Sequence, residues 1–96
     1  MPMKVNLVNN TKKLKELTKK ELFLYIILFT VNYCKVKYIT FSRIREIYKC
    51  IYNENITIKE IERIFFKLLK LHIIKKEKFE LISEGIRINE KKNSYS

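Results

Sequence analysis

Residues 55–74 constrain the fold more than any other part of this 96-residue chain. On a helical wheel of about 100° per residue, their apolar side chains fall within one arc of roughly 160°. These side chains are Ile58, Ile61, Ile64, Phe65, Leu68, Leu69 and Leu71. Thr57 and Glu60 have the spacing of a capping box, in which a hydroxyl and a carboxylate satisfy free backbone amides at the start of a helix. We therefore expect a helix that begins after Thr57 and buries one face.

The opposite side of this helix is basic. An arc of about 80° holds four cations, with an aromatic residue beside them. They are Lys59, Arg63, Lys67 and Lys70, and the aromatic residue is Phe66. Lys and Arg outnumber the acidic residues by 21 to 10, and the net charge of +11 favours a polyanionic partner. A bias toward Lys, Ile and Asn explains the number of lysines but not their alignment. We expect this face to bind nucleic acid; the alternative is a merely solvated lysine face.

A second capping box, Thr18 with Glu21, predicts a helix that runs to about Tyr33. Residues 22–34 carry no charge over 13 positions, which is too short for a membrane span of about 20 residues. The helix is apolar nearly all round, so either its own chain covers it or a second copy packs on one side. We favour a homodimer. The expected interface residues are Phe23, Ile26, Ile27 and Thr30.

Residues 35–39 alternate between charged and apolar side chains and predict a short strand. Thr40 or Ser42 then caps a short helix, which keeps Arg43 and Arg45 off its apolar side. Residues 53–55, Asn-Glu-Asn, predict a turn. Two short helices joined by such a turn, the second one basic, are typical of a helix-turn-helix.

After His72 the period changes from helical to extended. Ile73 and Ile74 lead into residues 75–78, and residues 79–82 follow as a second apolar run. We interpret this as a β-hairpin with a charged four-residue tip. Ile86 and Ile88 then suggest a last turn or a short helix.

The order of helix, short strand, helix, turn, helix and hairpin resembles the winged helix-turn-helix family. Residues 68–87 carry the resemblance best, with Leu81, Ser83 and Gly85 as a shortened form of the ending that follows the second wing strand. In size and composition the chain is similar to small winged-helix regulators of archaeal viruses and plasmids. The resemblance implies an α+β, mostly α fold with three helices and a two-stranded β-hairpin wing. This domain would span residues 18–88, between an arm at 1–17 and a polar tail at 89–96.

The same resemblance implies a transcriptional regulator that binds double-stranded DNA. On this frame Arg63 suits a contact to guanine, and Phe66 suits either a thymine methyl group or packing on the wing or a partner. The expected DNA-binding residues are Lys59, Arg63, Phe66, Lys67 and Lys70 on the reading helix, Arg43 and Arg45 before it, and Lys75, Lys76 and Lys78 at the wing tip. The main alternative is a winged-helix module that binds another protein, without sequence-specific DNA binding. RNA binding is a weaker option, because an aromatic stacking platform on a sheet is not evident.

Other functions find little support in the sequence. One His, no Asp and no Gly-rich phosphate loop argue against an enzyme, a cofactor, a metal site or a small-molecule substrate. Cys34 and Cys50 form no metal-binding or CxxC pattern, so we expect two small buried side chains, or a disulfide if the source is a hyperthermophile. The N-terminus lacks a signal peptide, which predicts a cytoplasmic protein, in the host cytoplasm if it is viral.

Overall fold

The computed structural model describes residues 13–89, and much of the predicted arm and tail lies outside this range. Its elements are α2 (Lys19–Tyr33), β1 (Tyr38–Thr40), α3 (Phe41–Tyr52), α4 (Ile58–Lys70), β2 (Phe79–Ile82) and β3 (Gly85–Ile88), after a helical turn at residues 13–15. The three strands form one antiparallel sheet in the order β1-β3-β2. The predicted α+β, mostly helical class is confirmed. Within the described range no helix is long and apolar enough to cross a membrane.

Threonine caps begin all three long helices, as the sequence predicted. The Thr18 hydroxyl accepts a hydrogen bond from the Glu21 amide, and the Glu21 carboxylate accepts one from the Thr18 amide. Thr57 and Glu60 form the same reciprocal pair at α4. Thr40, rather than Ser42, caps α3. Each cap satisfies amides that the first helical turn leaves without a partner.

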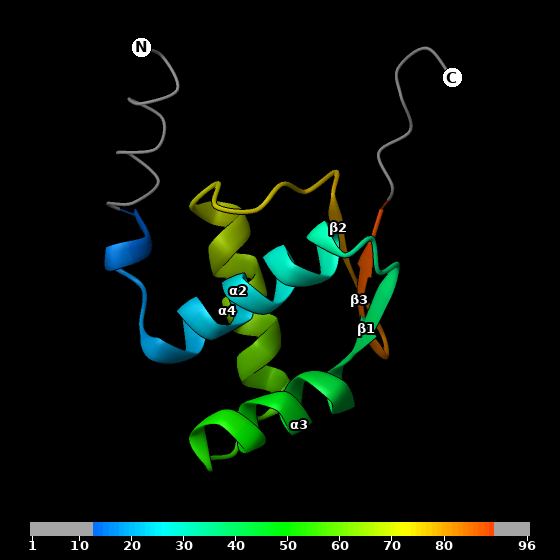
Figure 1. Cartoon of the computed structure of the whole chain (residues 1–96). Helices are drawn as coiled ribbons and strands as arrows, with labels where there is room; N and C mark the ends of the chain where they lie inside the picture. The colour runs from blue at the N-terminus through cyan, green and yellow to red at the C-terminus, as the bar shows by residue number, and fades with distance from the viewer. Residues whose placement is uncertain (1–12, 90–96) are drawn as a thin grey trace, which may run out of the picture.

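The core lies where α2, α3 and α4 meet the sheet. Figure 1 shows α2 crossing in front of α4, with α3 below both and the sheet to one side. The side chains that α2 and α4 bury in it are Phe23, Leu24, Ile27, Leu28, Ile61, Ile64, Phe65 and Leu68. Phe23 and Ile27 are only 3% and 9% exposed, so their assignment to a dimer interface was wrong: they pack inside their own chain. Ile26 and Thr30 are exposed.

The hairpin differs from the prediction. It is formed by β2 and β3, with its turn at Ser83 and Glu84. Residues 75–78, predicted as the tip, instead connect α4 to β2. Residues 85–88 form a strand, in which Ile86 and Ile88 face the core and Arg87 between them faces solvent, as the period of two requires. The first strand also lies later than predicted, at β1, and pairs with β3.

Gly85 permits the close packing of β1 on β3. It is buried and lies opposite Thr40 in the β1–β3 register. A Cβ atom built at Gly85 would lie 2.1 Å from the Ile39 carbonyl oxygen and 2.7 Å from the Thr40 Cα. No other residue type fits such a close approach of two backbones.

Gly85 is the only glycine of the chain, and its place in β3 means that it does not end a helix. Other residues take the left-handed conformation at the helix ends. After α4, His72 has φ 60°. The His72 amide donates to the Leu69 carbonyl and the Ile73 amide donates to the Leu68 carbonyl, both at 3.0 Å. These two bonds make a Schellman motif. Lys35 has φ 60° and forms the same motif after α2, where the Val36 amide donates to the Val31 carbonyl.

We expect His72→Gly to raise the free energy of unfolding by about 0.5–1 kcal/mol. Glycine removes the Cβ strain of the left-handed conformation, and this gain exceeds the entropy that glycine adds to the unfolded chain. Urea unfolding followed by circular dichroism measures the change. Asn53→Gly is the matched control, because Asn53 has φ 54° and asparagine already tolerates this conformation. A lower stability of His72→Gly would contradict the left-handed helix end.

Candidate nucleic-acid interface

Four side chains form a continuous exposed row on the outer face of α4. Lys59, Arg63, Phe66 and Lys70 follow one another at intervals of one helical turn, and all four are exposed. We call this row the α4 stripe. It extends over about 16 Å along the helix. The stripe lies opposite the buried face of α4, so the core fixes the direction in which it points.

Lys67, predicted to belong to the basic face, lies instead on the flank of α4 that meets α2. Its ammonium group is 3.0 Å from the Glu21 carboxylate, whose side chain is only 12% exposed. A second ion pair of 2.7 Å joins Lys20 of α2 to Glu60 of α4. These two pairs, which we call the α2–α4 clamp, join the first turn of α2 to α4. Lys67 is therefore engaged in an ion pair within its own chain, whereas within residues 13–89 the cations of the α4 stripe are not.

The carboxylates near the clamp are held in their ionised form. A hydrogen bond from Lys20, helped by the Thr57 amide, lowers the pKa of Glu60. Partial burial acts to raise the pKa of Glu21, but hydrogen bonds from Thr18 and Lys67 outweigh it and lower the pKa. Glu60 and Glu21 are therefore charged at neutral pH, and both ion pairs of the clamp are complete.

A shallow depression lies on the N-terminal half of the stripe. It is lined by Lys59, Glu62, Arg63 and Phe66, together with Glu60. Sequence reasoning did not single out Glu62, although the helical wheel places it at the edge of the stripe. A carboxylate there can accept a hydrogen bond from the amino group of cytosine. The depression thus combines two cations, two carboxylates and an aromatic ring.

The two arginines of α3 are engaged to different degrees. The Arg45 Nε donates to the Ile56 carbonyl at 2.8 Å, so this side chain holds the turn between α3 and α4. Arg43 pairs with Glu46 at 3.2 Å, and both side chains are about two-thirds exposed. An exposed pair of this kind is weak and exchanges readily. Arg43 is therefore better placed than Arg45 to contact another molecule.

The lysines predicted at the wing tip lie elsewhere. Lys75, Lys76 and Lys78 follow the C-terminal end of α4, where the first two are exposed and Lys78 is half-buried. The hairpin turn itself carries Ser83 and Glu84, and the Tyr38 hydroxyl donates to the Glu84 carboxylate at 2.9 Å. The hairpin tip is therefore acidic, and the cations suited to phosphate lie on the stripe and beyond its C-terminal end.

Comparison of the chain with models of protein families, with curated proteins and with solved structures found no match. In residues 13–89 no group of three or more His, Cys, Asp or Glu side chains could hold a metal ion. Cys34 and Cys50 are exposed free thiols, so the expectation of buried cysteines was wrong.

Proposed function

We propose that this protein is a winged helix-turn-helix transcriptional regulator that binds double-stranded DNA sequence-specifically through the α4 stripe. Helices α3 and α4, joined by a turn in which Asn53 is left-handed, supply the helix-turn-helix. The β2–β3 hairpin follows as a short wing. The observation that carries the proposal is the stripe itself: three exposed cations and one exposed aromatic ring in one row on the second helix of the motif.

The dimensions of the stripe suit the major groove of DNA. That groove is about 12 Å wide and admits one helix. Arg63, in the N-terminal half of α4, can donate two hydrogen bonds to the O6 and N7 atoms of guanine. Lys59 and Lys70, at the two ends of the stripe, are separated enough to reach phosphates on either side. Phe66, 55% exposed between them, can contact a thymine methyl group.

The cation distribution supports DNA over an acidic protein as the partner. Lys19, Lys20 and Lys67 are paired with carboxylates of the same chain, whereas the stripe cations have no ion pair within the described range. The stripe is regular and narrow, as a groove requires, and an aromatic residue interrupts it where a base edge would lie. A purely electrostatic protein contact needs neither feature.

Selection of bound sites from random duplex DNA tests the proposal. The wild-type chain should enrich one motif that contains a guanine, and Arg63→Ala should lose the preference at that base pair by about 1–3 kcal/mol. Lys37→Ala is the matched control, because Lys37 is exposed in the connection between α2 and β1. The control should select the wild-type motif. The absence of any enriched motif, or the same motif from Arg63→Ala, would overturn direct readout by the stripe.

A further inference from the structure

Within residues 13–89, the outer face of α2 is apolar and no other segment covers it. Ile26, Phe29 and Tyr33 lie on it within two helical turns and are 49%, 57% and 79% exposed. Single exposed apolar residues are normal on a protein surface, but a row of large ones marks an interface. The opposite face of α2 is buried in the core. The described part of the chain therefore covers one side of this helix and leaves the other side free.

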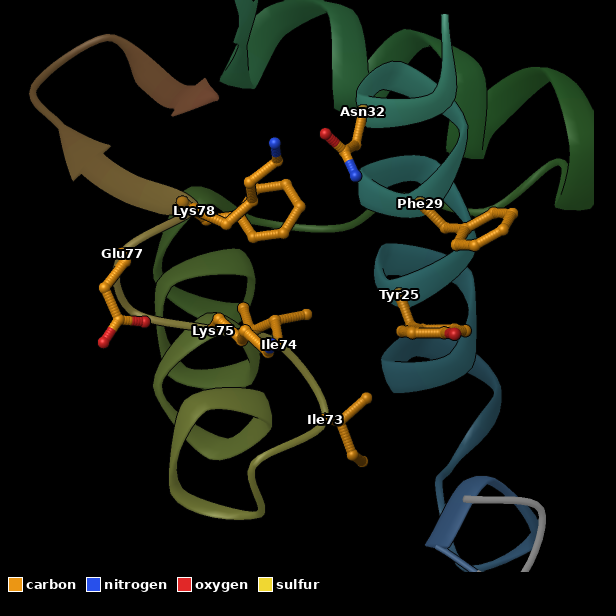
Figure 2. A pocket seen from close by; sticks show the side chains of 9 residues that line it. Tyr25, Phe29, Asn32, Ile73, Ile74, Lys75, Glu77 and Lys78 are labelled. Carbon is orange, nitrogen blue, oxygen red and sulfur yellow. The ribbon is translucent and has the colours of Figure 1, made fainter. Parts of the chain in front are cut away.

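A cleft of about 380 Å³ runs along this face, between α2 and the connection that follows α4. Its apolar walls are Tyr25, Phe29, Ile73, Ile74 and Phe79, and its polar rim is Asn32, Lys75, Glu77 and Lys78. Figure 2 shows α2 on one side and α4 with its connection on the other, with Asn32 and Lys78 pointing toward each other and Glu77 pointing away. A projecting apolar row thus lies directly beside an apolar hollow, since Phe29 belongs to both.

We propose that a second copy of this chain covers this face. The two α2 helices pack antiparallel about a two-fold axis, and the apolar row of each copy enters the cleft of the other. In a two-fold interface the same patch meets itself, so the patch has to be self-complementary. A row beside a hollow of similar chemistry meets that requirement. The proposed interface contains Ile26, as the sequence predicted, and it contains Phe29 and Tyr33 in place of Phe23 and Ile27.

The charge distribution favours a second copy over other occupants. Residues 22–34 are uncharged in a chain of net charge +11. Nucleic acid, an acidic protein or an anionic lipid surface would gain no ionic contact from this row. Two copies of the chain repel each other wherever their lysines meet, by about 1 kcal/mol for each close pair in water. Along α2 no cations lie opposite each other, and the rim of the cleft carries Glu77 beside Lys75 and Lys78.

The exposed apolar area on this face limits the strength of the dimer. Ile26, Phe29 and Tyr33 expose about 350 Å² of side chain, taking roughly 200 Å² for a whole aromatic residue. A stable interface buries about 800 Å² on each partner. The row alone is therefore too small. Tyr25 and the lining of the cleft add to this area, and the total stays below 800 Å² on each partner, as in weak, reversible interfaces.

Sedimentation equilibrium of the full chain in moderate salt tests the dimer. We expect a weight-average mass that rises with chain concentration toward twice the 11.7 kDa of one chain. Phe29→Glu should raise the dimer dissociation constant about 30-fold or more, because a hydrated carboxylate would replace an apolar ring at the centre of the interface. Phe29→Ala, which adds no charge, should weaken the dimer less. Ile51→Glu is the matched control: Ile51 is 60% exposed on α3, outside the row, and this variant should stay dimeric.

The proposal does not depend on DNA binding. A monomeric wild-type chain, or equal weakening by Phe29→Glu and Ile51→Glu, would overturn it. Circular dichroism shows whether each variant is folded. Phe29→Glu should still select, from random DNA, the short motif that a single α4 stripe recognises. Loss of the dimer and loss of DNA binding are therefore seen in different measurements.

Discussion

Gly85→Ala is expected to lower the free energy of unfolding by about 3 kcal/mol. The added Cβ would lie 2.1 Å from the Ile39 carbonyl oxygen. Neither atom can rotate away, because the Cβ is fixed by its bond to Cα and the oxygen belongs to the backbone. Strand β1 therefore has to move off β3 and lose the pairing of Ile39 with Ile86. A loss of this size is a large part of the total stability of a small domain, about 5–15 kcal/mol.

Urea unfolding followed by circular dichroism measures this loss. Ser83→Ala is the control, because Ser83 is exposed in the adjoining hairpin turn and its substitution should change stability by no more than about 0.5 kcal/mol. If Gly85→Ala unfolded at the wild-type urea concentration, the close approach of β1 to β3 would be wrong. Gly85→Val should be at least as destabilising as Gly85→Ala.

The second large effect concerns DNA affinity. Replacing Lys59, Arg63 and Lys70 together by alanine should reduce affinity for duplex DNA about 100-fold or more at physiological salt. Each lost phosphate contact also reduces the slope of log affinity against log salt concentration by about 0.9, so the triple variant should have a slope shallower by about 2–3. Fluorescence anisotropy titrations at several salt concentrations measure both quantities.

A triple variant with the same loss of charge separates the stripe from net charge. Lys35, Lys37 and Lys49 are exposed outside α4, and their joint replacement by alanine should change affinity and slope much less. Equal losses in the two variants would mean that the chain binds DNA through its overall charge, and the stripe would then have no special role.

Helices α2 and α4 were predictable because the determinants are local. The Thr18–Glu21 and Thr57–Glu60 boxes each lie within one turn, and the apolar period of α4 covers its whole length. The hairpin was not predictable in the same way. The sequence suggested that Ile73–Ile74 begin the hairpin and that Ile86 and Ile88 form a turn or a short helix. Residues 85–88 form the strand instead, and this pairing depends on the contact of Gly85 with β1, more than forty residues earlier.

In the candidate site, too, the features set by local sequence were predictable and those set by distant contacts were not. The wheel predicted Lys59, Arg63 and Lys70 on one face, and the structure leaves all three exposed. It also predicted Lys67 there, but that side chain is held by Glu21, 46 residues away. Such a pairing depends on how α2 crosses α4, which no periodicity reveals.

The outer face of α2 was ambiguous for a related reason. The helix is apolar nearly all round, so the sequence pattern does not tell which side the core takes. Tertiary packing decides that Phe23 faces inward and Phe29 outward. The cleft beside α2 is likewise formed by segments distant in the sequence.

The α2–α4 clamp bears on the kind of operator this protein would recognise. Lys20 and Glu21 of α2 both form ion pairs with α4. These two contacts help to fix the orientation of α4 relative to α2. Two subunits joined through α2 would then hold their two α4 helices at a fixed separation. The matching DNA would be an inverted repeat with a single permitted spacer, and lengthening that spacer by half a helical turn would place the second half-site on the wrong side of the duplex.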